Sequence, residues 1–306
     1  MRRALAILLA MLMVLALTAC GESAAPAPAP EATPEAAPAE EAEPAAEETA
    51  VASGVEDGVL TIAMECAYAP YNWTQGDDSN GAVPIKDSDG EYANGYDVMM
   101  AKKICEANGW QLEVIKADWD SLVPGVQSRT YDAVIAGQST TPERSERVDF
   151  AGPYLYATIV CLTRADSPFA SAQGINDLAG GSCTSQSATI WYDTMLPQIP
   201  DANIQPAAES APAMLMALET GTVDFVCTDM PTALGAVRAY PDMVLLDFAG
   251  SENDFVAEDG DINIGVSVFK GNTVLLDAIN AVLSPMTADD FNAMMDEAIA
   301  VQPADA

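Results

Sequence analysis

Apolar runs of strand length alternate with amphipathic helical patterns, and this alternation constrains the fold more than any other feature. Between residues 59 and 136 the order is strand, helix, strand, helix, strand. The expected elements are strands at Val59–Met64, Leu112–Ile115 and Tyr131–Ala136, a helix at Tyr96–Asn108 and a short helix after Asp120. This order is typical of a parallel sheet covered by helices. The sequence therefore predicts an α/β fold.

The same alternation starts again after residue 158 and predicts a second α/β lobe. Its expected elements are strands at Thr158–Leu162, Ser182–Gln186, Asp224–Thr228 and Ile262–Phe269, and helices at Ile190–Leu196, Ala211–Thr220, Thr273–Leu283 and Ala288–Val301. The pattern leaves open which lobe the last elements complete. Thr74–Asn94, rich in Gly, Asp and Asn, is expected to be a long loop after the first strand.

The first 54 residues are expected to lie outside the folded part. Arg2 and Arg3 precede an apolar run, Ala4–Leu17, that is too short for an ordinary membrane-spanning helix. The run ends in Leu-Thr-Ala-Cys, which resembles a bacterial lipobox, so residues 1–19 are predicted to be a lipoprotein signal peptide and Cys20 the lipidated residue. Residues 20–54 are predicted to be a disordered tether, because Ala, Pro and Glu dominate them and cannot form a core.

The composition of the chain excludes several classes of function. It has no histidine, which removes Ser-His and Cys-His nucleophilic sites and His-ligated zinc, and no catalytic residue, metal or cofactor is predicted. Without residues 1–19, ten Lys and Arg face 46 Asp and Glu, a balance that opposes nucleic-acid binding. The acidic run Asp87–Glu91 is expected to be a surface turn rather than a calcium loop.

Five cysteines lie beyond Cys20, an odd number without CxxC spacing. They are Cys66, Cys105, Cys161, Cys183 and Cys227. The last three sit in apolar runs, where cysteine usually acts as a small core residue. Mostly free thiols are therefore expected, with room for one bridge.

The stretch Ala136–Phe150 carries the first candidate site. Gly137 and Ser139 follow an apolar run, and Arg144 lies about one turn into a helix that Pro142 is expected to open. A guanidinium beside small hydroxyl residues can hold a carboxylate in bidentate fashion. The alternative is a helix cap followed by a solvated charge cluster, and the stretch alone leaves both interpretations open.

The residues of this stretch belong to a larger set of polar and aromatic residues that follow predicted strands, at the strand ends where ligands bind in open α/β sheets. They are Glu65, Tyr68, Tyr71, Trp73, Trp119, Gly137, Ser139, Arg144, Gln186, Thr189 and Asp229. Aromatic side chains as walls, an arginine to bind a carboxylate and an aspartate to bind an ammonium group together suit an α-amino acid as the ligand. Each residue has an alternative as a core aromatic or a helix cap. Their shared position at strand ends favours a binding site.

From about residue 58 to residue 301 the sequence resembles the solute-binding proteins of the polar amino-acid family, the extracellular receptors of ABC importers. The matching runs are AYAPYNW at 67–73, NGYDVMMAKKI at 94–104, DWDSLVPGV at 118–126, AGQSTTPERSERVDFAGPY at 136–154, NDLAGGSCTSQSAT at 176–189 and LETGTVDFVCTD at 218–229. The resemblance implies a two-lobed periplasmic-binding-protein fold of type II, with each lobe built on a mostly parallel sheet and the ligand clamped between the lobes.

The resemblance also implies where the lobes divide. The first would comprise residues 55–157 and 250–306, and the second residues 158–249. The chain would cross near Leu155–Thr158 and return near Ala249–Glu258. The resemblance further implies a binding role for each site residue. Tyr68 and Trp119 would flank the ligand, and Ala136, Gly137 and Ser139 would offer backbone and hydroxyl partners. Arg144, with Thr189, would bind the α-carboxylate, Asp229 would bind the α-ammonium, and Glu65 and Gln186 would contact the side chain or the carboxylate.

Three features depart from the family pattern. Ala188 precedes Thr189 where the family usually has glycine, and Gln138 stands where an apolar residue is usual. The segment Thr74–Asn94 is longer than in compact members and could reshape the side-chain pocket.

The predicted function is capture of a polar or charged L-amino acid and its delivery to an ABC permease. The carrier would be a monomer, anchored to the cell membrane through Cys20 outside the cytoplasm. Two rival functions remain. A secreted enzyme on the same scaffold, such as a dehydratase, could use Glu65 as a general acid. An amino-acid sensor would bind without transport, although such a receptor would normally carry a spanning helix beyond the signal.

Overall fold

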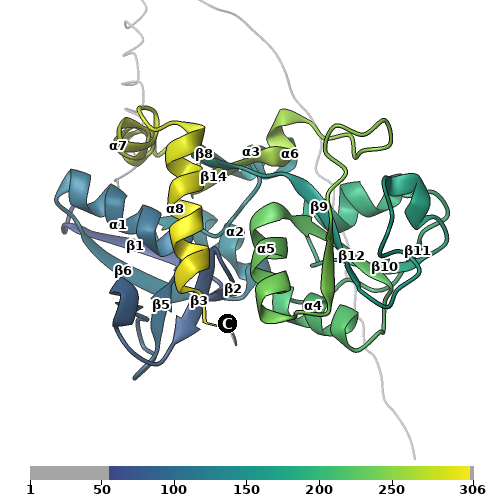
Figure 1. Cartoon of the computed structure of the whole chain (residues 1–306). Coiled ribbons are helices and arrows are strands. Elements are labelled where there is room, and N and C mark those ends of the chain that lie inside the picture. The colour runs from purple at the N-terminus through teal and green to yellow at the C-terminus, as the bar shows by residue number, and fades with distance from the viewer. Residues whose placement is uncertain (1–54, 304–306) are drawn as a thin grey trace, which may run out of the picture. The chain divides into compact units, whose positions relative to one another are not determined.

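The computed structural model describes residues 55–303, which form two five-stranded sheets, a small four-stranded sheet and flanking helices (Figure 1). The predicted signal peptide, the lipidation site at Cys20 and the tether up to residue 54 lie outside the described residues. The predicted two-lobed α/β fold is confirmed. The sheets were expected to be mostly parallel, but each large sheet is mixed, with two parallel and two antiparallel strand pairings.

The first large sheet has the strand order β6-β1-β7-β14-β8. Its strands are β1 (Val59–Met64), β6 (Gln111–Lys116), β7 (Ala133–Val134), β8 (Val148–Tyr156) and β14 (Asn263–Phe269). β1 pairs in parallel with β6 and β7, whereas β14 is antiparallel to β7 and β8. The end of the chain therefore completes the first lobe, an assignment that the sequence pattern alone left open.

The second large sheet has the strand order β11-β10-β12-β9-β13. Its strands are β9 (Ile159–Arg164), β10 (Ser182–Thr184), β11 (Asn203–Ile204), β12 (Phe225–Asp229) and β13 (Met243–Leu246). β12 runs parallel to β10 and antiparallel to β9. The chain thus leaves the first sheet after β8, builds the second sheet from β9 to β13, and returns to the first sheet at β14.

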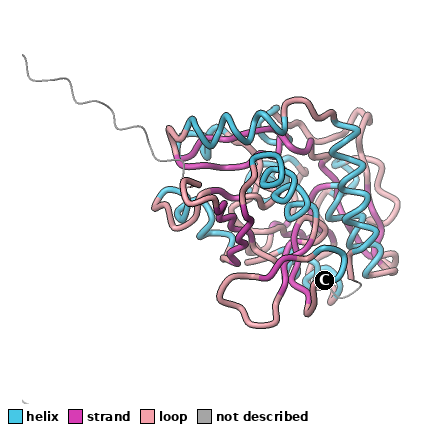
Figure 2. The backbone as a smooth tube through the Cα atoms, turned by 90° about the vertical axis from the view of Figure 1, so that its left-hand side faces the viewer, coloured by secondary structure: helices cyan, strands magenta, loops and turns pink. Residues whose placement is uncertain are grey.

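Helices flank both large sheets, as the cyan segments of Figure 2 show. They are α1 (Tyr96–Asn108), α2 (Leu122–Gln127), α3 (Pro142–Arg147), α4 (Ala211–Glu219), α5 (Met230–Ala239), α6 (Asp259–Ile262), α7 (Thr273–Leu283) and α8 (Ala288–Val301). The bounds of α1, α7 and α8 agree with the predicted ranges. Local signals set these ends: Gly109 adopts a left-handed conformation after α1, and Thr287 and Asp290 form a capping box before α8.

The segment Thr74–Asn94 differs from the single loop that was predicted. Much of it belongs to the small antiparallel sheet, whose strands are β2 (Ala67–Tyr68), β3 (Asn72–Gln75), β4 (Val83–Pro84) and β5 (Tyr92–Asn94). The Gln75 side-chain oxygen accepts hydrogen bonds from the Trp73 indole at 3.1 Å and from the Asn94 amide at 3.2 Å. The contact with Asn94 joins residues 19 positions apart, so a local sequence pattern could not predict it.

The helix predicted at Ile190–Leu196 is also irregular. The chain forms a π-helical turn at Trp191–Met195 and a short 3₁₀ turn at Leu196–Gln198. Pro197 has no amide hydrogen and cannot continue an α-helical ladder, which ends the element after about one turn.

Tyr131 supports the turn that carries Trp119. Residues Trp119–Ser121 form a 3₁₀ turn directly before α2, and the Tyr131 hydroxyl donates to the carbonyls of Ser121 and Leu122, each at 2.8 Å. Gly125 of α2 lies against the same ring, since a Cβ placed there would be 2.0 Å from the Tyr131 oxygen. Close packing at Gly125 therefore positions the Trp119 turn.

We expect Gly125→Ala to lower the free energy of unfolding by about 1–3 kcal/mol, because the added methyl group forces Tyr131 out of its place. Gly76→Ala is the matched control, since nothing lies within 4 Å of a Cβ at that position. Urea denaturation measures both variants. Equal midpoints for the two would contradict the packing described here.

Candidate ligand-binding site

Tyr68 and Asp229 form a hydrogen bond between the two lobes. Tyr68 lies in β2, and its hydroxyl donates to Oδ2 of Asp229, the last residue of β12, at 2.5 Å. Oδ1 of Asp229 accepts from the amide of Thr232 at 2.8 Å and so caps α5. Burial raises the pKa of Asp229, and the hydrogen bonds from Tyr68 and Thr232 oppose this shift. A buried carboxylate is thus held here by neutral donors.

Arg144 bridges the lobes on the other side of the cleft. Its guanidinium donates to the carbonyl of Ser139 at 3.0 Å and to the carbonyl of Ala188, in the second lobe, at 2.8 Å. It also lies 5.3 Å from the centroid of the Trp119 ring. Burial lowers the pKa of Arg144 to about 10, so the group stays charged at neutral pH. Thr141 caps α3 through the Arg144 amide, so the two interpretations of this stretch, a helix cap and an anion-binding arginine, are compatible.

Glu65 and Gln186 make a third contact between the lobes. The Gln186 amide lies 3.1 and 3.3 Å from the two carboxylate oxygens of Glu65. Glu65 is only 7% exposed, and burial raises its pKa to about 7, with smaller contributions from Asp118 and Asp120. This carboxyl group is therefore only partly ionised near neutral pH.

Seven of the ten predicted site residues line one small cavity between the lobes. The lining residues are Tyr68, Trp119, Gly137, Ser139, Arg144, Gln186, Thr189, Ile190 and Trp191. The cavity has a volume of about 10 Å³, roughly the space that one water molecule needs. An amino acid can therefore enter only if the lobes move apart.

The other three predicted residues lie outside this lining. Glu65 and Asp229 connect to the cavity through their hydrogen bonds with Gln186 and Tyr68. Ala136 is fully buried at the strand end. Sequence reasoning missed Ile190 and Trp191. Their position directly after the predicted site residue Thr189 was the one signal that could have found them.

The backbone amide of Gly137, expected to be a ligand partner, already has a partner in the protein. It donates to the Tyr154 hydroxyl at 2.9 Å, and this hydroxyl donates to Oδ1 of Asp97 at 2.7 Å. Asn72 donates to Oδ2 of Asp97, also at 2.7 Å. Burial raises the pKa of Asp97 to about 7. This network lies behind the cavity and was not predicted; the only local signal was an acid, Asp97, at the buried start of α1.

Gly137 is needed for the shape of the turn. Its φ angle is +64°, and a Cβ there would lie 2.9 Å from the Tyr68 ring. Any larger residue would separate the turn from that aromatic wall.

The two single-residue departures from the family pattern have different consequences. Gln138 is buried, and its side-chain oxygen accepts from Ser267 of β14 at 3.0 Å, so a polar residue is satisfied inside the first lobe. Ala188 adopts a left-handed conformation, with φ at +53°, which favours glycine. Its carbonyl accepts from both Arg144 and Trp119, so the strained turn belongs to the contact between the lobes.

An open groove of about 840 Å³ adjoins Glu65. Residues of both lobes line it, and four of them are acidic: Glu65, Asp118, Asp120 and Glu209. Lys116 is the one cation among its lining residues, and it is turned toward Thr74 and Glu91, at 3.1 and 3.5 Å. The groove therefore presents a mainly acidic surface that includes Glu65.

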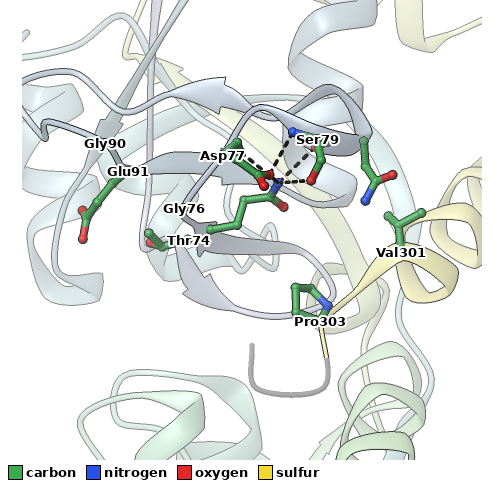
Figure 3. A pocket seen from close by; sticks show the side chains of 10 residues that line it. Thr74, Gly76, Asp77, Ser79, Gly90, Glu91, Val301 and Pro303 are labelled. Atoms are coloured by element: carbon green, nitrogen blue, oxygen red, sulfur yellow. Dashed lines mark hydrogen bonds between the residues drawn. The ribbon is translucent and has the colours of Figure 1, made fainter.

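The inserted segment lines a different pocket, of about 520 Å³, between residues 74–91 and the end of α8 (Figure 3). There Asp77 and Ser79 face one another and share hydrogen bonds with Gln75. No residue of this segment lines the small cavity or the acidic groove. Thr74 and Glu91 contact Lys116, which lines the groove. Within residues 55–303 no cluster of three or more acidic, Cys or His side chains could hold a metal ion. No helix in that range is long and apolar enough to cross a membrane.

Two α/β lobes that meet over a small cavity, with an arginine and a buried carboxylate at its sides, define a two-lobed solute-binding protein. The family model "Bacterial extracellular solute-binding proteins, family 3" matches residues 60–298. The chain belongs to this family, which confirms the resemblance drawn from its motifs. Proteins of this family act outside the cytoplasm, and the predicted extracytoplasmic location agrees with this.

Individual relatives show how wide the family is. The ABC transporter arginine-binding protein 1 of Escherichia coli K12 is 26% identical over 195 residues, covering 64% of this chain and 76% of the relative. The L-cystine-binding protein TcyJ of the same strain is 23% identical over 238 residues, covering 76% and 79%. A solved structure of the ancestral amino acid-binding protein AncCDT-1, a precursor of cyclohexadienyl dehydratase, is 24% identical with a TM-score of 0.64, covering 80% of this chain and 97% of that one.

Replacing Ala188 by glycine should raise the free energy of unfolding by about 0.5–1 kcal/mol. The left-handed conformation costs an alanine roughly 1–2 kcal/mol, and the greater freedom of glycine in the unfolded chain offsets part of that gain. Ala293→Gly, at an exposed position inside α8, should instead lower it by about 1 kcal/mol. Chemical denaturation distinguishes the two, and a loss of stability in Ala188→Gly would show that the turn is not strained.

The raised pKa of Glu65 predicts a pH-dependent effect of Glu65→Gln. The folded wild type keeps this proton up to about pH 7, whereas the unfolded chain loses it near pH 4.5, so the stability that Glu65 contributes falls as the pH rises between these values. Relative to wild type, the variant should therefore gain up to about 3 kcal/mol of unfolding free energy across this window. Denaturation at several pH values measures the difference, and curves that stay parallel would disprove the shift.

Proposed function

We propose that this protein captures a cationic L-amino acid between its two lobes and delivers it to an ABC importer. The observation that carries the proposal is a pair of opposite charges at this cavity. Arg144 lines it, and Asp229 is hydrogen-bonded to Tyr68, which also lines it. The Arg144 guanidinium is held by two carbonyl groups, and the Asp229 carboxylate by a hydroxyl and an amide. Neither takes part in a salt bridge within residues 55–303. A zwitterionic ligand would supply a carboxylate to Arg144 and an ammonium group to Asp229.

Ligand binding would exchange these contacts one for one. An α-carboxylate would replace the carbonyls of Ser139 and Ala188 as the acceptor for Arg144, with a stronger, charge-assisted hydrogen bond. An α-ammonium would replace the Tyr68 hydroxyl as a donor to Asp229. The lobes would open about their two crossings, admit the ligand and close again, and the permease would recognise the closed form.

The side chain of the ligand would point toward Glu65 and the acidic groove. A guanidinium or ammonium group placed there would meet the Glu65 carboxylate and the field of Asp118, Asp120 and Glu209. A cation would also favour the ionised form of Glu65, whose pKa is high in its absence. The arginine-binding relative supports the choice of L-arginine as the first candidate, although the cystine-binding relative is equally compatible with the fold.

The proposal extends to the parts of the chain outside the described residues and to the lobe boundaries. The mature protein would be a monomer tethered through lipid on Cys20, with lobes comprising residues 55–157 plus 250–306 and residues 158–249. The lipobox-like sequence and the composition of the tether support the anchor, and the strand orders of the two large sheets support the division.

A second candidate is an enzyme on the same scaffold. Glu65 is buried beside the cavity with a pKa of about 7, a property that suits a general acid. The neighbour described as a precursor of a dehydratase shares the fold. Against this function, residues suited to hold an α-carboxylate and an α-ammonium, Arg144 and Asp229, are both present. Product formation from a candidate substrate would favour the enzyme.

A thermal-shift screen of the full chain against the twenty amino acids and cystine tests the proposed ligand class. L-Arginine at 100 times its dissociation constant should stabilise the fold by about 2.7 kcal/mol. Arg144→Lys and Asp229→Asn should each weaken binding by roughly 2–5 kcal/mol, because each leaves a ligand charge poorly paired in a buried site. Isothermal titration would give these losses directly.

Arg147→Ala is the matched control for Arg144, since Arg147 is an exposed arginine of the same helix that contacts Gln127. Its affinity should stay within a factor of two of wild type. If no amino acid shifts the melting temperature, or if Arg147→Ala weakens binding as much as Arg144→Lys, the clamp proposed here is wrong.

A further inference from the structure

Three fully buried cysteines share one face of the second large sheet. They are Cys161 of β9, Cys183 of β10 and Cys227 of β12. All three belong to the main apolar core, whereas their strand neighbours Val160, Leu162 and Val226 belong to a separate cluster on the opposite face. The three thiols therefore point to the same side.

Cys161 and Cys227 lie directly opposite one another in the antiparallel pair β9·β12. The amide of Met230 donates to the carbonyl of Thr158 at 2.9 Å, which makes those two residues a hydrogen-bonded pair. Because hydrogen-bonded and non-hydrogen-bonded pairs alternate, positions 161 and 227 form a non-hydrogen-bonded pair. In agreement, the Cys227 carbonyl points away from β9 and accepts from the Ser185 hydroxyl at 2.7 Å.

This register brings the two cysteines within reach of a disulfide. Non-hydrogen-bonded pairs have Cα atoms about 4.5 Å apart, at the lower end of the range of roughly 4.4–6.8 Å that disulfides span. Cys183 lies opposite Phe225, two residues before Cys227. Such diagonal neighbours are roughly 7–8 Å apart, beyond the distance that a disulfide bridges without backbone movement.

We propose that Cys161 and Cys227 are a redox site that closes to a disulfide when the exported chain folds. The structure holds both as free thiols, the reduced form of the pair. The family works outside the cytoplasm, where disulfides persist. The bond would join the strand that enters the second lobe to the strand that ends in Asp229, and it would link residues 66 positions apart in the sequence.

The oxidant is a disulfide, either a low-molecular-weight compound or an extracytoplasmic thiol oxidoreductase. The thiolate of one cysteine attacks it, forms a mixed disulfide and releases one thiol. The thiolate of the other cysteine then attacks the protein sulfur of that mixed disulfide, forms the Cys161–Cys227 bond and releases the second thiol. The two protons lost by the cysteines end on the two released thiols, so the oxidant takes up both electrons.

The reaction belongs to folding rather than to the finished protein. Burial, with a contribution from the hydrogen bond to Cys161, raises the pKa of Cys227 well above its usual range, and a buried thiol is a poor nucleophile. Both side chains are fully covered in the native state. Once formed, the bond should resist reductants unless the second lobe unfolds.

The test is peptide mapping of the full chain after refolding with oxidised and reduced glutathione, with thiols blocked under denaturing, non-reducing conditions. One linked pair of peptides, carrying Cys161 and Cys227, is expected. Cys66, Cys105, Cys183 and an unlipidated Cys20 should be blocked as free thiols. The oxidised protein should melt roughly 5 °C or more above protein refolded with dithiothreitol. Cys183→Ala should keep both the link and this difference, whereas Cys161→Ala should lose both.

Mapping of the wild-type chain decides the proposal even if a variant fails to fold. Blocked thiols at both Cys161 and Cys227 after oxidative refolding, or a link that involves Cys183 in place of Cys161, would overturn it. A melting temperature that does not depend on the redox treatment, despite the mapped link, would show that the bond does not stabilise the second lobe.

Discussion

The hydrogen bond between Tyr68 and Asp229 is the contact on which the account of the cleft depends. A carboxylate without exposure to water needs either a counter-charge or several donors, and here it has a hydroxyl from the first lobe and the start of a helix from the second. Arg144 is a partly buried cation that forms no salt bridge within residues 55–303, and its guanidinium hydrogen bonds go to carbonyl oxygens. The closed lobes thus leave two unlike charges apart, each surrounded by neutral dipoles. Such an arrangement is stable and is also ready to exchange its partners for a zwitterion.

The residues behind the cleft support this arrangement. The Gly137 turn is fixed by Tyr154 and Asp97, and the Trp119 turn by Tyr131. Glu65 adds a carboxyl group whose pKa is raised to about 7, and it lines a groove with a strongly negative field. A cationic ligand would gain from this field both on approach and when bound. The side of the site that holds the α-amino and α-carboxyl groups and the side that selects the ligand are therefore distinct.

Part of the fold could be predicted because its signals are local. The ranges of α1, α7 and α8 follow from an apolar period and from caps at their ends. β8 was missed because Asp149, Gly152 and Pro153 interrupt its apolar pattern, and only its pairing with β14, more than 100 residues later, makes it a strand. The small sheet was missed for the same reason.

The candidate site was predictable to the extent that ligand residues follow strands. Tyr68, Arg144 and Asp229 all stand near strand ends, and the structure brings them to one cleft. The sequence could not predict which groups the residues would contact in the closed lobes, since these contacts join positions up to 161 residues apart. It also gave no indication that the Gly137 amide would be taken by Tyr154, because that pairing depends on how β8 enters the sheet.

The most direct test of the central claim is a crystal structure of the protein with the amino acid that stabilises it most. The account predicts the α-ammonium within about 3 Å of Asp229 and the α-carboxylate on the Arg144 guanidinium, in place of the Ala188 carbonyl. It also predicts a cavity enlarged by movement of the lobes. A ligand seated only in the acidic groove, with the Tyr68–Asp229 and Arg144–Ala188 contacts intact, would contradict it.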